Sequence, residues 1–212
     1  MRAPRLDNRG EQREMTHRLL AISAFTLLEM LVVISIIVIL IALAVRGTGS
    51  VLDGRRMEEA GRIAMDEINL ARQLAAARNL NVELRLIKKK RNTDSIATFH
   101  AIQRGIIAKD GKFTPVTGIT ALPEGIVFAP EEDLSSMIDS LPQKNSDAGY
   151  AYTAIVIRPT GMIEPQPGLD LNAPWFVTAI YERDSGKEED KISNFVTIQI
   201  DPWTSRPVLY RP

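Results

Sequence analysis

An acidic side chain inside an apolar segment is the feature of this sequence with the clearest chemical consequence. Glu29 lies within residues 25–45, which read FTLLEMLVVISIIVILIALAV and contain no other charged residue. A carboxylate in a low-dielectric environment is costly unless a cation lies beside it. The pattern therefore predicts a functional site at Glu29, and that site needs a cationic partner.

Two further charged clusters could bind ligands. Residues 88–91, KKKR, could contact phosphates, but no aromatic residues are interleaved with them to stack bases, so a solvated hairpin turn is favoured. Residues 188–190 with Asp184 form an acidic loop, but Lys187 interrupts it, and calcium needs roughly six to eight oxygen ligands. Residues 131–133, EED, fit the N-terminus of a helix without any ligand.

The composition excludes several kinds of active site. The 212 residues include no cysteine and only two histidines, His17 and His100, so thiolate chemistry is excluded and a histidine-based triad or metal cluster has almost no donors. Ser135 and Ser136 have no nucleophile context. The 26 basic residues balance the 26 acidic ones, which argues against nucleic acid as a partner. We therefore expect no enzyme activity, no metal and no cofactor.

The apolar segment is long enough to cross a bilayer as a helix. Its 21 residues span roughly 31 Å at about 1.5 Å per residue. Fifteen of them are Leu, Ile, Val or Phe; these contribute on the order of −6 kcal/mol to insertion, against roughly 3 kcal/mol for an acid at the bilayer centre. We predict a transmembrane helix at residues 25–45. A secretory signal cleaved after Ala44 and a plain signal anchor are the alternatives.

Residues 24–34, AFTLLEMLVVI, resemble the class III signal of type IV prepilins and type II secretion pseudopilins. In that family a prepilin peptidase cuts before the Phe and methylates the new amine, and the Glu is the fifth residue of the mature chain. The resemblance implies a cut between Ala24 and Phe25, with Ala24 in place of the usual Gly, and puts Glu29 fifth. Residues 1–24 are then a basic leader that is removed, starting at Met1 or Met15.

The same resemblance supplies the cation that Glu29 needs. Cleavage creates an α-amine on Phe25, with an unperturbed pKa of about 7.7–8. If Glu29 of one subunit meets the Phe25 amine of a neighbour, both desolvation penalties shrink and the axial register of adjacent helices is fixed. We predict that Ala24 and Phe25 form the processing site and that Phe25 and Glu29 form the assembly site.

The family implies a structural role. The chain is expected to be a minor pilin or pseudopilin in a type II secretion-like or type IV pilus-like filament. Its expected partners are the prepilin peptidase, other pilin-like subunits and the inner-membrane assembly platform. Arginines before the span favour a cytoplasmic N-terminus, hence a single-pass protein of the cytoplasmic (inner) membrane with a periplasmic or extracytoplasmic head. The alternative is a membrane-anchored binding module that does not polymerise, such as a DNA-binding minor pilin.

The residue pattern of 46–80 predicts a continuation of the helix outside the membrane. Gly47 and Gly49 are expected to weaken or bend it. Beyond them, apolar residues recur at steps of three and four and predict a stripe that packs on the protein's own sheet. The charged residues in between, Glu67 among them, are assigned to the other faces. The predicted stripe contains Met57, Ala60, Ala64, Ile68, Ala71 and Leu74.

The residue pattern of 81–212 predicts a β-rich head. Alternating apolar and polar residues and Pro/Gly turns indicate strands, and Trp175 and Trp203 are expected to cover the sheet edge or core. Residues 155–161 and 197–210 resemble the H-type minor pseudopilins, and the ending resembles the protein D pilin-like members of the Verru_Chthon cassette. The expected fold is α+β, a pilin-like lollipop whose long N-terminal helix, transmembrane in its first half, packs on an antiparallel sheet. Strands are expected at 82–87, 96–103, 126–129, 150–158, 176–183, 195–201 and 208–210.

Overall fold

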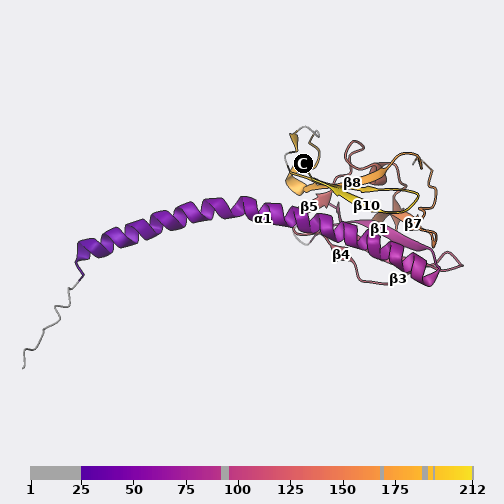
Figure 1. The fold of residues 1–212 in the computed structure, drawn as a ribbon, viewed down its shortest axis with the longest axis horizontal. Helices are drawn as coiled ribbons and strands as arrows, with labels where there is room; N and C mark the ends of the chain where they lie inside the picture. The colour runs from indigo at the N-terminus through magenta and orange to yellow at the C-terminus, as the bar shows by residue number, and fades with distance from the viewer. Residues whose placement is uncertain (1–24, 92–95, 168–169, 188–190, 193, 212) are drawn as a thin grey trace, which may run out of the picture. The chain divides into compact units, whose positions relative to one another are not determined.

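One long helix dominates the N-terminal part of the chain. The computed structural model describes residues 25–91, 96–167, 170–187, 191–192 and 194–211, without the side chains of 43–51. Helix α1, Leu27–Arg78, has 52 residues and appears in indigo to purple in Figure 1. It runs without interruption through Gly47 and Gly49, so the expected weakening there does not end the helix. An interior glycine costs about 1 kcal/mol, which the flanking turns can offset. The chain divides into two compact units, Met1–Arg46 and Gly47–Pro212.

Helix α1 ends at a residue that can adopt the left-handed conformation. Asn79 has φ 51°, and the Leu80 amide donates to the Ala75 carbonyl at 3.3 Å. This is the pattern of a Schellman C-cap, in which Asn is the common substitute for Gly. The last turn also carries Arg78, whose charge is favourable at the negative end of the helix dipole. The chain thus reverses at Asn79 and enters the first strand.

The second part of α1 packs on the sheet through small side chains. Met57, Ala60, Ala64, Ile68 and Ala71 are at most 3 % exposed, which confirms most of the predicted stripe. Its last position is Ala75 rather than Leu74, which is only partly buried. Because four of the six buried residues are alanines, the helix axis can approach the strands closely.

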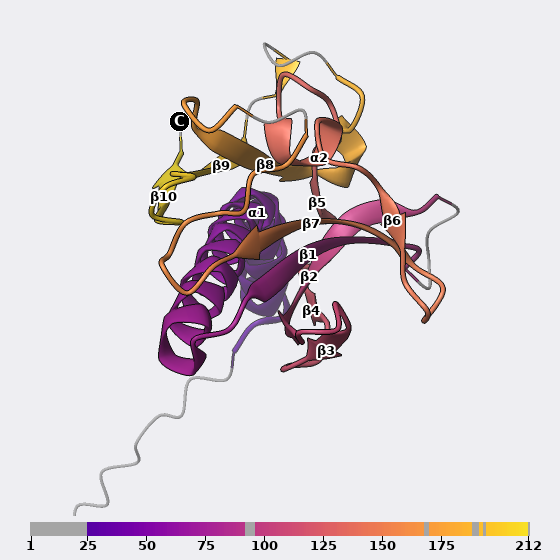
Figure 2. The same ribbon diagram turned by 90° about the vertical axis from the view of Figure 1, so that its right-hand side faces the viewer.

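Within the described residues, the sheet is antiparallel throughout and contains ten strands. Their order is β10-β9-β8-β5-β2-β1-β7-β6, with β3 and β4 paired to β2. Figure 2 shows α1 on one face of the sheet, with β3 and β4 beside β2. The strands are β1 Val82–Lys89, β2 Thr98–Ile107, β3 Phe113–Pro115, β4 Thr120–Ala121, β5 Ile126–Phe128, β6 Lys144–Asn145, β7 Ala151–Ile157, β8 Trp175–Tyr181, β9 Val196–Ile200 and β10 Pro207–Tyr210; the short helices are α2 Ser136–Asp139 and η1 Glu182–Asp184.

The α+β class and all seven predicted strands are confirmed, with ends that shift by a few residues. Three short strands, β3, β4 and β6, were not predicted. The predicted helix start at residues 131–133 is wrong, because these residues form a turn and α2 begins at Ser136. With only two or three residues each, the unpredicted strands are too short for alternation to be read.

The second face of β1 is also buried, which the predicted alternation of exposed and buried residues did not anticipate. Glu83 and Arg85 are 7 % and 8 % exposed, and the Arg85 Nε donates to the Glu83 carboxylate. The Arg85 guanidinium lies 3.4 Å from the ring centroid of Phe113 and 4.1 Å from that of Tyr152. Burial raises the pKa of the Tyr152 phenol, and the positive charge of Arg85 partly opposes that rise. Phe113, on β3, thus covers a charged pair that a two-layer arrangement would leave in water.

Gly105 keeps Phe113 in this position. An added Cβ at Gly105 would lie 2.6 Å from the Thr114 carbonyl oxygen and closer still to the Phe113 ring. We expect Gly105→Ala to lower the free energy of unfolding by about 1–3 kcal/mol, because β3 and Phe113 must move away from Arg85. Urea denaturation measures this. Gly118→Ala is the matched control, since no atom lies within 4 Å of its added Cβ; an equal loss in both variants would contradict the steric explanation.

Candidate functional site

One predicted assembly residue, Glu29, lies in the first turn of α1, and the other, Phe25, lies two residues before the helix begins. Thr26 directly precedes the helix; its Oγ1 accepts a hydrogen bond from the Glu29 backbone amide at 3.2 Å, and its carbonyl accepts one from the Met30 amide at 3.2 Å. Thr26 is therefore the N-cap, and Glu29 occupies the third helical position, as in the T-x-x-E pattern of a capping box. A carboxylate in the first turn is also favoured by the helix dipole. Sequence reasoning missed this second role of Glu29, although the pattern was readable.

The structure places Phe25 just before the helix and Glu29 in its first turn, and leaves both open to contact. The Phe25 side chain is 64 % exposed, and Glu29 is exposed as well. In the described part of the chain no cation pairs with the Glu29 carboxylate. Ala24, the other half of the predicted processing site, lies outside the described residues. The paired-charge contact was predicted between subunits, and it remains a prediction.

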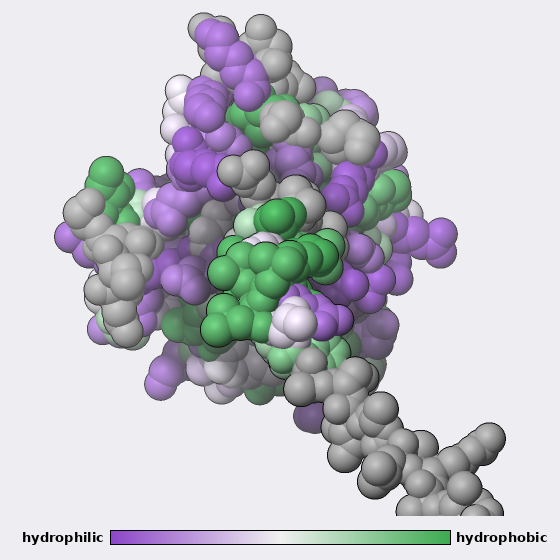
Figure 3. Space-filling view, turned by 90° about the vertical axis from the view of Figure 1, so that its left-hand side faces the viewer, coloured by the Kyte–Doolittle hydropathy of each residue, from purple (hydrophilic) through white to green (hydrophobic). Residues whose placement is uncertain are grey.

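The apolar segment exposes its side chains on all sides of the helix. The large hydrophobic residues from Phe25 to Ile41 are between 42 % and 85 % exposed. Figure 3 shows a patch of apolar side chains, in green, on the face that it presents. Nothing in the described part of the chain covers them, so water, lipid or other proteins must surround this surface.

Among the residues whose placement is described, no helix is both long enough and apolar enough to span a membrane.

A buried ion pair joins α1 to the sheet. Glu67 on α1 is 8 % exposed, so its assignment to an outer helix face is wrong. One of its carboxylate oxygens accepts a hydrogen bond from Arg104 on β2, and the other accepts one from the Thr120 hydroxyl on β4 at 3.0 Å. Both carboxylate oxygens are thus satisfied, which a buried acid requires. We name Glu67, Arg104 and Thr120 the helix–sheet clamp.

The basic run at residues 88–91 is partly structural. Arg91 donates to the carbonyls of Pro123 at 3.1 Å and Ile126 at 2.8 Å, and it lies 3.9 Å from Glu182. Lys88 Nζ lies 5.5 Å from the Phe99 ring centroid. Only Lys89 and Lys90 are exposed, so four adjacent cations do not form one phosphate-binding surface.

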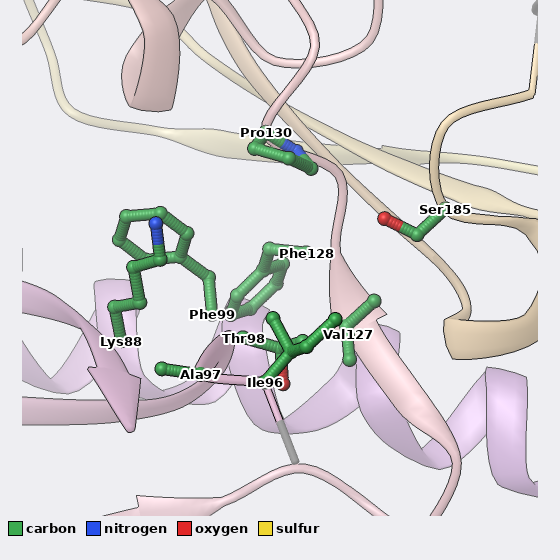
Figure 4. Close-up of a pocket in the computed structure, with 9 residues that line it drawn as sticks. All are labelled: Lys88, Ile96, Ala97, Thr98, Phe99, Val127, Phe128, Pro130 and Ser185. Carbon is green, nitrogen blue, oxygen red and sulfur yellow. The ribbon is translucent and has the colours of Figure 1, made fainter. Parts of the chain in front are cut away.

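A small apolar pocket adjoins this run. Its volume is about 200 Å³, and Figure 4 shows Phe99, Phe128, Val127 and Ile96 around it. Residues 92–95, which follow Arg91 in sequence and precede Ile96, lie outside the described residues. The described residues that line the pocket include no cluster of converging polar groups, so they indicate no particular ligand.

The acidic and hydroxyl side chains have structural partners. Lys187 Nζ lies 2.6 Å from the Asp184 carboxylate, so the residue that interrupts the acidic loop in sequence also pairs with it; residues 188–190 lie outside the described set. The Ser135 hydroxyl accepts from the Thr178 amide at 3.1 Å, and the Ser136 hydroxyl accepts from the Phe176 amide at 3.0 Å. The two serines supply acceptors to β8 beyond the end of β5.

The two tryptophans differ sharply in exposure. Trp175 is 1 % exposed and donates from its indole to the Asp170 carbonyl at 2.9 Å, as expected for a core residue. Trp203 is 54 % exposed, so a core position is wrong for this residue. The sequence offered no signal for this difference, because both residues lie beside proline near strand ends.

No model of a known protein family matches the chain. No curated protein matches it either. Among solved structures, the chain is similar to the minor pseudopilin EpsH from the type 2 secretion system of Vibrio cholerae, with 9 % sequence identity and a TM-score of 0.41; the match covers 74 % of this chain and 96 % of that one.

Proposed function

We propose that this chain is a pilin-like structural subunit and not an enzyme. The observation that carries the proposal is the N-terminal part of α1, where exposed apolar side chains surround the helix and the single acid lies four residues after Phe25. A surface of this kind is stable only in lipid or against other helices. The continuation of the same helix is held on an antiparallel sheet by the alanine stripe and the helix–sheet clamp.

The finer parts of the proposal follow the N-terminal signal. A prepilin peptidase removes residues 1–24 and methylates Phe25; residues 25–45 anchor the chain in the cytoplasmic membrane with the head outside the cytoplasm. The Phe25 amine of one subunit then pairs with Glu29 of the next in a type II secretion-like or type IV pilus-like filament. Sister subunits and an inner-membrane platform are the partners. The anchor rests on the composition of residues 25–45.

The mass of the mature N-terminal peptide tests this function. We expect a chain that begins with N-methyl-Phe25 when the protein is produced together with a prepilin peptidase. Ala24→Gly is expected to be processed at least as completely, and Ala24→Leu is expected to retain the leader, because a bulky residue does not fit a site for small ones. A chain that begins at Val45 would instead indicate a secreted domain, and an unprocessed leader would indicate a plain anchor; either result contradicts the proposal.

A further inference from the structure

An open groove on the Gly47–Pro212 unit combines cations with an exposed indole. It lies between α1 and the turns at residues 159–161 and 202–206 and has a volume of about 370 Å³, within the range of small-ligand sites, about 300–1,000 Å³. Arg72 and Arg206 line it together with Trp203. None of the residues described around this groove is acidic. The side chains of Arg72 and Arg206 form no ion pair or hydrogen bond within the described part of the chain.

The missing countercharge distinguishes this groove from others on the same unit. A groove on the outer face of α1 contains two arginines and two glutamates, and the groove around Tyr181 contains Arg56 and Arg183 together with three acids. In a chain with equal numbers of acids and bases, two arginines that line one groove with no acid among its lining residues leave a local positive potential. Guanidinium groups bind carboxylate and phosphate groups through paired hydrogen bonds, so the groove suits an anion.

Trp203 adds an apolar face, and the backbone of the turn that carries it is held by hydrogen bonds. The Asp201 carboxylate accepts hydrogen bonds from the Trp203 amide at 2.9 Å and the Thr204 amide at 2.8 Å, and the Ser205 hydroxyl donates to the Gly161 carbonyl. The turn that carries the indole is thus ordered before any ligand arrives, which lowers the entropic cost of binding. An exposed indole beside cations favours a ligand with a ring that can stack on it.

Hydrogen-bonding groups in the groove favour a sugar ring over a nucleic-acid base. Gln73, Thr160 and Thr204 line the same groove. The two threonine hydroxyls each accept a hydrogen bond from a backbone amide at 3.4 Å, which leaves their O–H protons free to donate. Single-stranded nucleic acids are usually bound by successive aromatic rings and by many phosphate contacts. This groove has one aromatic ring and two cations.

We propose that this groove binds an anionic saccharide, with the sugar ring stacked on Trp203 and its carboxylate held by Arg72 and Arg206. Gln73 and the two threonines would contact the sugar hydroxyls. The inference does not depend on the proposed assembly function, because all of these residues belong to the Gly47–Pro212 unit.

The test is a binding titration of the full-length chain in detergent with short galacturonic-acid oligomers. We expect saturable binding that weakens at least about tenfold in Trp203→Ala and in the double variant Arg72→Gln/Arg206→Gln, because charged hydrogen bonds are removed. Trp203→Phe should retain part of the affinity. The matched control is Lys89→Gln/Lys90→Gln, which removes the same charge from a different cationic groove and should change the affinity by less than about twofold.

Neutral galactose oligomers and single-stranded oligothymidylate complete the experiment. Neutral oligomers should bind at least about tenfold more weakly than the acidic ones if the arginines hold a carboxylate. Tighter binding of oligothymidylate, absence of saturable binding to galacturonate, or an equal loss in the lysine control would each overturn the proposal. Thermal unfolding of each variant shows whether a lost affinity reflects a lost fold; the exposed position of Trp203 predicts unchanged unfolding.

Discussion

Replacing Glu67 with leucine is expected to lower the free energy of unfolding by about 3–5 kcal/mol. The change leaves the Arg104 guanidinium between α1 and the sheet without a countercharge, and it removes the acceptor of the Thr120 hydroxyl. Arg104 is only 12 % exposed, so water cannot replace the carboxylate without opening the packing. Urea denaturation of the full chain, followed by circular dichroism, measures the loss.

A double-mutant cycle identifies the ion pair as the cause. Arg104→Leu alone should be comparably destabilising, whereas Glu67→Leu/Arg104→Leu should recover most of the loss, because an apolar pair often replaces a buried ion pair without cost. Glu58→Leu is the surface control. Its partner Arg62 lies 2.9 Å away but is 74 % exposed, so the expected change is at most about 1 kcal/mol. If Glu67→Leu costs no more than Glu58→Leu, the clamp does not hold the helix to the sheet.

The clamp also shows where sequence periodicity reaches its limit. Arg104 lies between Ile102 and Ile106 in β2, on the face that packs against the helix, where alternation alone predicts an apolar residue. Glu67 lies next to Ile68, at the border of the apolar stripe of α1. A charge on an inner face requires a partner of opposite sign, so the pair could have been proposed from these two exceptions. The sequence alone does not say which acid of the helix pairs with Arg104, because that depends on how the helix packs on the sheet.

Long elements were predictable because their patterns extend over many residues. The helix stripe repeats over several turns, and the seven predicted strands each carry an apolar face or a continuous apolar run. The third layer over Arg85 was not predictable, because it depends on Phe113 reaching across β2 to Arg85 from a strand of only three residues. For the same reason the cationic groove was missed: Arg72 and Arg206 are far apart in sequence, and neither belongs to a basic run.

Replacing Glu29 with alanine is expected to preserve leader removal but to reduce incorporation into filaments at least about tenfold, since an unpaired amine at the apolar interface is costly. The effect on the helix itself should be small. Thr26 caps the Glu29 backbone amide, which alanine retains, so the loss is confined to the dipole contribution of about 0.3–1 kcal/mol. The measurement compares the filament fraction with the mass of the mature N-terminal peptide in the same cells.

Two further variants separate the charge of Glu29 from the capping of the first turn by Thr26. Glu29→Gln keeps the Thr26 cap and the size of the side chain but removes the charge, so it should assemble as poorly as Glu29→Ala. Thr26→Ala removes the cap, at a cost of about 0.5–2 kcal/mol, and should still assemble because the carboxylate remains. Normal assembly of Glu29→Gln together with failure of Thr26→Ala would contradict the charge-pairing role and show that assembly needs the capped first turn instead. We expect Glu29→Gln to fail and Thr26→Ala to assemble. A neutral side chain at position 29 leaves the Thr26 cap intact, but it cannot supply the charge that pairs with the Phe25 amine.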